Sequence, residues 1–435
     1  MWHLTFDPTG GFILNVAGGA EPGLLSGRER EHLRTLARQV AEIAAEPAQQ
    51  QKRDRWYRHI ALERTRPMLL VFLEDSWLEV LPVKAAVEVR DPFWGQYEWT
   101  FKHLLYRDAH LHDDFVVEPD LYVPMIFRTG DWGIEAAEYS HTENERGSYN
   151  WTPPLRDPDD IRKLRRAEFA VDTAATQKRF DAVRDLFGDL LGVHLHCPAP
   201  GTALYDMATH LRGIEQCMLD MYDRPQWLHE LMDFLSAEML SRFTYLEEGG
   251  FLTLNNRNHY VDSGGIGYTR ELPAAGYDGR HVRMRDLWCH GVAQAASEIG
   301  PEQHEEFILG YDLRILERAG LNAYGCCEPY THKFEMLKRR IPRLRRVSVS
   351  PWCDVGKAAE ALADQYICSW KPNPAMLVGQ FHREKIRPYV RRALETARDC
   401  AMEIILKDTI TLNDEPRRVE EWIGVVREEI DRLWA

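Results

Sequence analysis

The feature of this sequence that most constrains its fold is a series of short apolar runs separated by helical patterns. Helical patterns occur at 225–247, 301–319 and 383–402. Continuous apolar runs are typical of buried parallel strands, which are connected by helices. About eight strands are predicted, at 68–73, 121–127, 192–197, 251–255, 321–326, 347–350, 366–369 and 403–407. That number predicts an α/β fold, a closed (β/α)8 barrel of the TIM type with long loops at its C-terminal face. A doubly wound open sheet is the alternative, although no Gly-x-Gly-x-x-Gly follows an early strand.

The N-terminal region lacks a buried-strand pattern. A polar, alanine-rich helix is predicted from the N-cap candidate Ser26 to about Lys52, followed by a short helix near 56–63. We therefore predict a mostly helical N-terminal extension at 1–60 and a barrel at 61–435.

Two long irregular segments interrupt the barrel pattern, at 128–160 and 256–290. The first holds aromatic residues and a proline pair, and we expect it to form a loop over the barrel mouth. The second is rich in glycine and polar residues. Long irregular segments in a compact domain are usually lids or binding loops. The aromatic and apolar residues of the second segment argue against disorder.

Composition excludes several classes of protein. The net charge of −14 does not suit sequence-independent nucleic-acid binding, which needs a basic surface. The basic run at 338–346 is split by Pro342, and we interpret it mainly as a solvated helix end. No run approaches the roughly 20 apolar residues of a membrane span, and we recognise no export signal. Eight scattered cysteines without Cys-x-x-Cys predict reduced thiols and a cytoplasmic protein.

Polar or aromatic residues follow nearly every predicted strand, where the active sites of barrels lie. Glu74 and Asp408 are candidate acids or bases if burial raises a pKa, and Lys371 and Lys407 could stabilise negative charge. These four are the predicted catalytic residues. The predicted substrate-binding residues are Trp77, Asn256, Arg257, His259, Trp288, Gln294, Trp352 and Asn373. Each of them alone could equally be a satisfied polar group or a packing residue at the rim.

The stretch AYGCCEPY at 323–330 places Cys326 beside Cys327 at a predicted strand end. Neighbouring cysteine side chains usually diverge, so they do not easily share one tetrahedral metal, and a disulfide between them is strained. A metal ligand, a nucleophilic thiolate and a close-packed pair of small side chains all remain open.

The chain resembles the uroporphyrinogen decarboxylase-like superfamily, in the branch that includes corrinoid-dependent and cobalamin-independent methyltransferases. The resemblance covers about 60–433 and is carried by HCPAPGTALYDMATHLRG, MYDRPQWLHELMDFLS, IGPEQHEEFILGYDLRI, LRRVSVSPWCDV and SWKPNPAML, which begin at 196, 221, 299, 344 and 369. It implies a (β/α)8 barrel with an active-site cleft at the carboxyl ends of the strands.

Departures from the family pattern narrow the expected activity. Uroporphyrinogen decarboxylases carry an N-terminal arginine cluster for the carboxylates of their substrate. Here Arg64 and Arg66 precede the first strand of the barrel, whereas Glu74 and Asp75 follow it. Acidic residues at this exit would repel a substrate with many carboxylates, which disfavours a role in haem synthesis.

The zinc-dependent relatives carry His-x-Cys at the fifth strand and another cysteine near the last strand. Cys326 falls on the family cysteine, whereas Tyr324 replaces the histidine and Asp408 or Lys407 stands where the other cysteine might. A mixed zinc site remains an option. Its predicted ligands are Cys326, Cys327, His290 and Glu328, with Asp408 as a further candidate.

The resemblance therefore implies a methyltransferase that acts on a small methylated compound or a corrinoid carrier, with zinc as an optional cofactor. No corrinoid-binding Asp-x-His-x-x-Gly occurs, so a corrinoid would arrive on a partner protein. The alternatives are a metal-free decarboxylase or lyase for a carboxylated substrate, and a non-catalytic corrinoid or tetrapyrrole binder. Related barrels are often dimeric, which makes a homodimer a candidate assembly.

Overall fold

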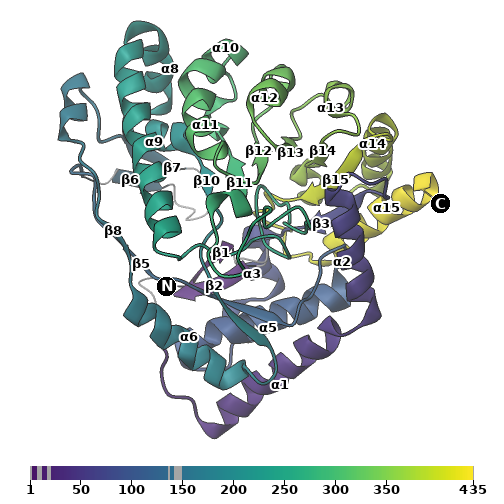
Figure 1. Ribbon diagram of the computed structural model, residues 1–435. Helices are drawn as coiled ribbons and strands as arrows, with labels where there is room; N and C mark the ends of the chain where they lie inside the picture. The colour runs from purple at the N-terminus through teal and green to yellow at the C-terminus, as the bar shows by residue number, and fades with distance from the viewer. Residues whose placement is uncertain (1, 7–11, 17–20, 136–137, 142–148, 435) are drawn as a thin grey trace.

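The computed structural model of the chain is a mixed α/β structure built around a parallel sheet (Figure 1). It describes residues 2–6, 12–16, 21–135, 138–141 and 149–434. Seven parallel strands form the sheet in the order β10-β11-β12-β13-β14-β15-β3. In that order, their bounds are Gly201–Thr202, Trp288–Gly291, Leu321–Tyr324, Leu344–Val349, Ile367–Trp370, Ala401–Leu406 and Met68–Val71. Every residue of β3, β12 and β14 is buried, as expected for strands covered on both faces.

Helices alternate with these strands, and α10 to α14 form an arc around β11 to β15 in Figure 1. The predicted helix at 225–247 is confirmed, and helices also form at 301–319 and 383–402, but with shorter ends. The second contains a π-helical turn at Glu305–Leu309 and ends at Leu316, and the third ends at Thr396 because β15 begins at Ala401. The bounds are Pro225–Glu248 for α9, Pro301–His304 for α10, Gly310–Leu316 for α11, Phe334–Arg340 for α12, Val355–Leu362 for α13, Arg383–Thr396 for α14 and Arg417–Trp434 for α15.

Two helices, α1 (Gly27–Ala44) and α2 (Pro47–Ile60), form the N-terminal region. The predicted N-cap is confirmed, because Ser26 and Glu29 form a reciprocal capping box. The single helix predicted up to Lys52 is wrong, since α1 ends at Ala44 and α2 begins at Pro47. A proline suits the first position of a helix, where its missing N–H is not needed.

The predicted strand at 251–255 is wrong, because this stretch has no regular structure. Trp288–Gly291 (β11) instead pairs with β12, inside the segment that was expected to be irregular. The side chain of Asn255 accepts a hydrogen bond from the Trp288 N–H at 3.0 Å and donates one to the Trp288 carbonyl at 3.1 Å. Side-chain bonds thus connect 251–255 to β11 in place of a strand ladder.

A separate parallel pair is formed by β4 (Asp120–Pro124) and β9 (Gly192–His196). Among the described strands, no ladder joins β3 to β4 or β9 to β11. The hydrogen-bonded strands in this part of the chain therefore form an open seven-stranded sheet and a two-stranded sheet, and not one closed ring.

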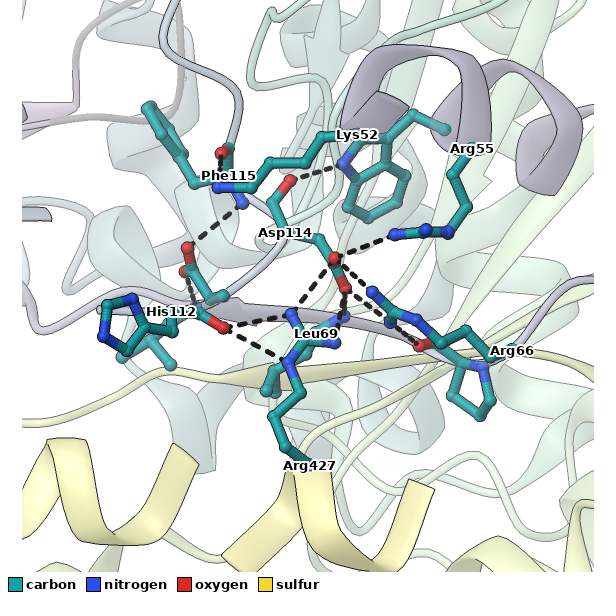
Figure 2. Close-up of polar contacts among 12 residues, drawn as sticks. Lys52, Arg55, Arg66, Leu69, His112, Asp114, Phe115 and Arg427 are labelled. Carbon is teal, nitrogen blue, oxygen red and sulfur yellow. Dashed lines mark hydrogen bonds and ion pairs between the residues drawn. The ribbon is translucent and has the colours of Figure 1, made fainter. Parts of the chain in front are cut away.

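Two aspartates satisfy the open edge of β3. Asp114 accepts a hydrogen bond from the Leu69 N–H at 2.8 Å, and Asp113 accepts one from the Val71 N–H at 3.0 Å. The Asp114 N–H also donates to the Leu69 carbonyl at 2.7 Å. Figure 2 shows Asp114 beside Leu69 and surrounded by arginines. A buried strand edge without such partners would leave costly unpaired backbone groups.

The segment 256–290 was predicted to be a lid or binding loop, but much of it is buried. The carboxylate of Asp262 accepts a hydrogen bond from Arg346 of β13 at 2.8 Å. A Cβ on Gly264, which has φ of +91°, would lie 2.5 Å from Ile405 of β15. Only glycine accommodates both the backbone conformation and this close approach. The middle of the segment is therefore part of the interior.

The remaining elements surround this core. The first irregular segment contains β5, β6 and β7, while 136–137 and 142–148 lie outside the described residues. β1 pairs with β2, β5 with β8, and β6 with β7, all antiparallel. The strand bounds are Trp2–Phe6, Phe12–Val16, Phe127–Thr129, Glu138–His141, Tyr149–Thr152 and Phe169–Val171 for β1, β2 and β5 to β8. The helix bounds are Trp77–Val80, Val83–Ala86, Pro92–His110, Thr173–Phe187, Leu204–Arg212 and Ile214–Asp223 for α3 to α8.

Within the described ranges, no helix has the length and apolar character required to cross a membrane.

Candidate functional site

Three strand ends bring a thiol, an ammonium group and two carboxylates together. Cys326 lies two residues beyond β12, Lys407 directly follows β15, and Glu74 follows β3. The Nζ of Lys407 lies 3.5 Å from the Sγ of Cys326. It also lies 3.1 Å from Asp408 Oδ1 and 3.8 Å from Glu74 Oε1. Because the thiol and the ammonium are both buried, their charges interact in surroundings of low polarity.

The backbone is left-handed at all three strand ends. The φ angle is +47° at Glu74, +98° at Gly325 and +60° at Asp408. Gly325 adopts this conformation without strain, because it has no side chain. For the two acidic residues, the left-handed backbone costs on the order of 1 kcal/mol or more of conformational free energy each. Such strain persists where the surrounding structure holds a residue in place, and it is common at functional sites. This observation distinguishes Glu74 and Asp408 from ordinary rim carboxylates.

The two cysteine side chains have different environments. The Sγ atoms lie 3.4 Å apart, the Ser263 hydroxyl donates to Cys326 Sγ at 3.1 Å, and Cys327 Sγ lies 3.2 Å from Asp408 Oδ2. The hydrogen bond from Cys327, together with Lys407 and Ser263, outweighs burial and lowers the pKa of Cys326 to about 4. The same contact and burial raise the pKa of Cys327. These contacts therefore favour a Cys326 thiolate beside a Cys327 thiol.

Burial also changes the protonation of the other members. It raises the pKa of Glu74 to about 7, against the opposing effect of the Lys407 charge. Burial alone would lower the pKa of Lys407, but Tyr260, Cys326, Asp408 and Glu74 together raise it. The ammonium thus stays charged while Glu74 can exchange a proton near neutral pH. A carboxyl group with such a pKa is suited to general acid–base catalysis.

A cavity of about 300 Å³ lies at the carboxyl ends of neighbouring strands. Its lining includes Pro124 of β4, His196 of β9 and His290 of β11, with Tyr260 and Asp262 from the irregular segment. The volume lies at the small end of the range for ligand pockets. His290 connects the cavity to the cysteines, because its Nε2 lies 3.0 Å from the carbonyl of Gly325.

Glu328, a predicted metal ligand, has a structural role. Its carboxylate accepts hydrogen bonds from the Cys326 N–H and the Ala293 N–H, both at 3.0 Å, and from the Tyr330 hydroxyl. It is fully buried, and burial raises its pKa. These contacts fix the turn that carries Cys326 and occupy both carboxylate oxygens.

The four predicted metal ligands do not form a compact donor set. Among the described residues, His32, Glu88 and Glu98 are the group whose ligand atoms all lie within 4.8 Å of one another. There the Lys102 ammonium already lies 2.7 Å from Glu98 and 3.4 Å from Glu88. That cluster therefore already contains a cation.

The three predicted tryptophans of the site lie either in the core or on the surface. Trp77 is fully buried and packs edge-on against His103, and Trp288 is fully buried with its indole N–H donating to the Gly267 carbonyl. Both are core residues. Trp352 is 69% exposed. Aromatic residues at strand ends thus proved to be ambiguous, because a ring serves equally well for packing.

Lys371 is buried, and its Nζ donates to the Ser369 hydroxyl at 2.6 Å and the Ser369 carbonyl at 3.1 Å. Burial lowers its pKa. Asn373 caps a short helical turn by accepting from the Ala375 N–H at 2.9 Å. The N–H of Gln294 donates to Asp206 at 3.1 Å. The hydrogen bonds of these three residues thus go to groups other than the cysteine pair, although the Lys371 charge also interacts with Cys326.

Asn256, Arg257 and His259 line a second cavity, of about 390 Å³, together with Tyr122 and His194. Part of the hydrogen-bonding capacity of Asn256 is already engaged, since its side-chain amide donates to the Leu272 carbonyl at 2.6 Å. Burial lowers the pKa of His259 well below its usual value, so this imidazole is neutral. These three predicted substrate residues thus line the second cavity, and they do not line the cavity of about 300 Å³ beside His290.

Sequence reasoning did not include Ser263 or Tyr260 among the site residues. Ser263 contacts the Cys326 thiolate, and Tyr260 lines the cavity of about 300 Å³. Both come from the segment expected to be a lid. The only local signal was the turn Asp262-Ser263-Gly264-Gly265, in which Asp262 Oδ1 accepts from the Gly265 N–H at 2.6 Å.

No known family model matches the chain, and no curated protein matches it either.

Proposed function

We propose that the chain is a transferase that uses the Cys326 thiolate to take a methyl group from a small methylated compound. The single observation that carries this proposal is that the buried Sγ of Cys326 lies 3.5 Å from the Lys407 ammonium. A thiolate is the reactive form of cysteine, and a neighbouring cation maintains it at neutral pH. Glu74, with a pKa of about 7, supplies the proton that a leaving group requires.

The proposed step is a nucleophilic displacement. An electron pair on Cys326 Sγ forms the bond to the methyl carbon, and the bond from that carbon to its original heteroatom breaks. The leaving group keeps the electron pair and takes the proton from Glu74. A second nucleophile, which the resemblance implies is a corrinoid carrier on a partner protein, would then take the methyl group and restore the thiolate.

We also propose a (β/α)8 barrel of the uroporphyrinogen decarboxylase-like superfamily, with two seams between its strands. β12 and β15 are separated by β13 and β14, so in a flat sheet they would be about 14 Å apart. Side chains that follow these two strands nevertheless lie 3.5 Å apart. Strong inward curvature of the sheet accounts for this approach and supports the barrel. A cytoplasmic location is likewise proposed, on the basis that the eight cysteines, all in described parts of the chain, are free thiols.

The residues present do not fit a zinc centre. Lys407 occupies the position beside Cys326 that a cation would take, and Glu328 has both oxygens engaged. His290 directs Nε2 at the Gly325 carbonyl. We therefore assign to Lys407 the charge stabilisation that a metal would supply.

Intact-mass analysis and peptide mapping test the proposal. The protein is incubated with a panel of sulfonium, quaternary ammonium and methyl ether compounds. We expect one donor to methylate Cys326 in the wild-type protein and in Cys327→Ala, and not in Cys326→Ser. Absence of methylation by every donor in a folded protein, or equal labelling of Cys326→Ser, would contradict it.

A second candidate is a decarboxylase for a carboxylated substrate. The favouring observation is that Lys407 and Glu74 lie 3.8 Å apart. The ammonium could bind a carboxylate or stabilise the carbanion left by loss of carbon dioxide, and protonated Glu74 could protonate that carbon. Release of carbon dioxide that persists in Cys326→Ser and is lost in Glu74→Gln would favour this candidate over methyl transfer.

A further inference from the structure

A second polar cluster lies at the opposite end of β3 from Cys326. Arg55 of α2, Arg66 before β3 and Arg427 of α15 converge on the carboxylate of Asp114 (Figure 2). Arg66 donates two hydrogen bonds to it, at 2.7 and 3.0 Å, and Arg427 donates one at 3.1 Å. Three guanidinium groups from three distant segments thus share one buried carboxylate.

Arg55 is the member with unused binding capacity. Its guanidinium lies 3.6 Å from Asp114 Oδ1, as an ion pair and not as a hydrogen bond. Within the described part of the chain, Arg55 makes no side-chain hydrogen bond, although a guanidinium offers five N–H donors. Its side chain is 32% exposed, so a ligand from solvent can reach it.

The cluster borders a cavity of about 470 Å³, which Lys52 also lines. The Lys52 ammonium donates to the Phe115 carbonyl at 3.1 Å, which leaves its charge without a carboxylate partner among the described residues. Negative groups are present as well. Asp113 is paired with Arg107 at 2.6 Å, whereas Asp108 accepts only an amide hydrogen bond from Gln49 and Glu46 lies at the rim.

Around Arg55 itself, three guanidinium groups face the one carboxylate of Asp114, although the whole cavity lining carries four cationic and four carboxylate side chains. Burial lowers the pKa of Arg55, and the charges of Arg66 and Arg427 lower it further against the opposing effect of Asp114. One carboxylate therefore does not compensate the three guanidinium groups. An additional anion in this position would be attracted by charge and would find free donors.

We propose that this cavity binds a compact phosphate dianion, either free or as the phosphoryl group of a small molecule, through Arg55 and Lys52. The arginine fork matches the oxygens of phosphate, and the cavity is large enough for a phosphorylated metabolite. Because the cluster joins α2, the start of β3 and α15, bound phosphate stabilises the attachment of α2 and α15 to the sheet. The proposal does not depend on the proposed methyl transfer, since Cys326 and Lys407 lie at the other ends of their strands.

Isothermal titration and thermal unfolding of the full chain test this site with inorganic phosphate and with glycerol 3-phosphate. Chloride at matched ionic strength controls for screening. We expect saturable binding and a raised melting temperature for the wild-type protein. Loss of a charged hydrogen-bond donor predicts about ten-fold weaker binding in Arg55→Gln or Lys52→Gln.

Arg58→Gln is the matched control, because Arg58 lies on the same helix but pairs with Glu63 at 2.9 Å outside the cavity. It should bind phosphate with an affinity within about two-fold of wild type. Tighter binding of glycerol 3-phosphate than of inorganic phosphate would identify the ligand as a phosphorylated small molecule. The reverse order would identify it as free phosphate. Absence of saturable binding of both probes, or wild-type affinity in both Arg55→Gln and Lys52→Gln, would overturn the proposal.

Discussion

The ammonium of Lys407 lies 3.5 Å from the thiol of Cys326, although the two residues are 81 positions apart in the chain. In the methyl transfer that we propose, the ammonium stabilises the thiolate. It also joins the ends of two strands that are not neighbours in the sheet. The same contact therefore supports both the chemistry and the inward curvature of the sheet that we propose.

Cys326 is expected to react with iodoacetamide at pH 5 to 6, because its pKa of about 4 leaves it as a thiolate there. Cys327→Ala should raise the apparent pKa of Cys326, since the hydrogen bond from Cys327 is the main cause of the low value. Mass spectrometry of labelled peptides as a function of pH measures both effects. Buried Cys217, whose pKa is about 12, is the internal control. Labelling of Cys326 that begins only above pH 8 would contradict the assignment.

Glu74→Gln should stabilise the protein at pH 8. The pKa of Glu74 is raised from 4.5 to about 7, so between these values the folded state holds a proton that the unfolded state releases. Stability is therefore lost as pH rises from about 4.5 to 7, by about 3 kcal/mol for this group. Urea unfolding at pH 4.5 and pH 8 should show that the gain of the variant over wild type is larger at pH 8. An unchanged difference would show that Glu74 titrates normally.

Asp114→Asn should cost about 3–5 kcal/mol at pH 7, because it leaves Arg66 and Arg427 without their buried counter-charge. These arginines lower the pKa of Asp114 against the effect of burial. The stabilisation that the Asp114 carboxylate provides is thus fully present above the usual pKa of an aspartate, and it is lost progressively as the pH falls below that value. Denaturant unfolding at pH 7 and pH 3 measures the effect. Asp189→Asn, which removes an exposed partner of Arg34, should cost far less than Asp114→Asn, because solvent screens exposed ion pairs.

Arg346→Met should destabilise the protein by about 3 kcal/mol or more. Arg346 is buried and pairs with Asp262 at 2.8 Å and with Glu403 at 2.9 Å, so its removal leaves two buried carboxylates without a cation. Arg345→Met is the control on the same strand, because Arg345 pairs with the half-exposed Glu271. Urea unfolding of both variants should separate them clearly, and equal losses would contradict the internal role of Arg346.

Protein purified without chelator should contain far less than one equivalent of zinc. The reason is the donor geometry, in which Lys407 takes the cation position beside Cys326. Elemental analysis by mass spectrometry measures this directly, and Lys407→Gln tests whether removal of the ammonium permits metal binding. One equivalent of zinc that is lost in Cys326→Ser would refute our assignment.

Local patterns in the sequence were sufficient for much of the secondary structure. The apolar runs that became β3 and β12 to β15 are continuous because both faces of these strands are covered, and this burial leaves a direct imprint on the sequence. The capping box at Ser26 and the helix at Pro225–Glu248 are also encoded within a few turns of chain. Cys326, Lys407 and Glu74 could be recognised as strand-end residues for the same reason.

Other features were decided only by tertiary structure. The run at 251–255 has a strand-like pattern, but Trp288–Gly291 takes the place beside β12, because a strand forms only where a partner edge is free. The aromatic side chains of Trp77 and Trp288 could line a cleft or fill a core, and packing placed both in the core. The low pKa of Cys326 arises from Cys327, Lys407 and Ser263. Two of these three contacts join distant parts of the chain, so spacing in the sequence cannot reveal them. The sequence therefore determined which residues stand at the strand ends, and the tertiary structure determined which of them meet, because the meeting residues lie far apart in the chain.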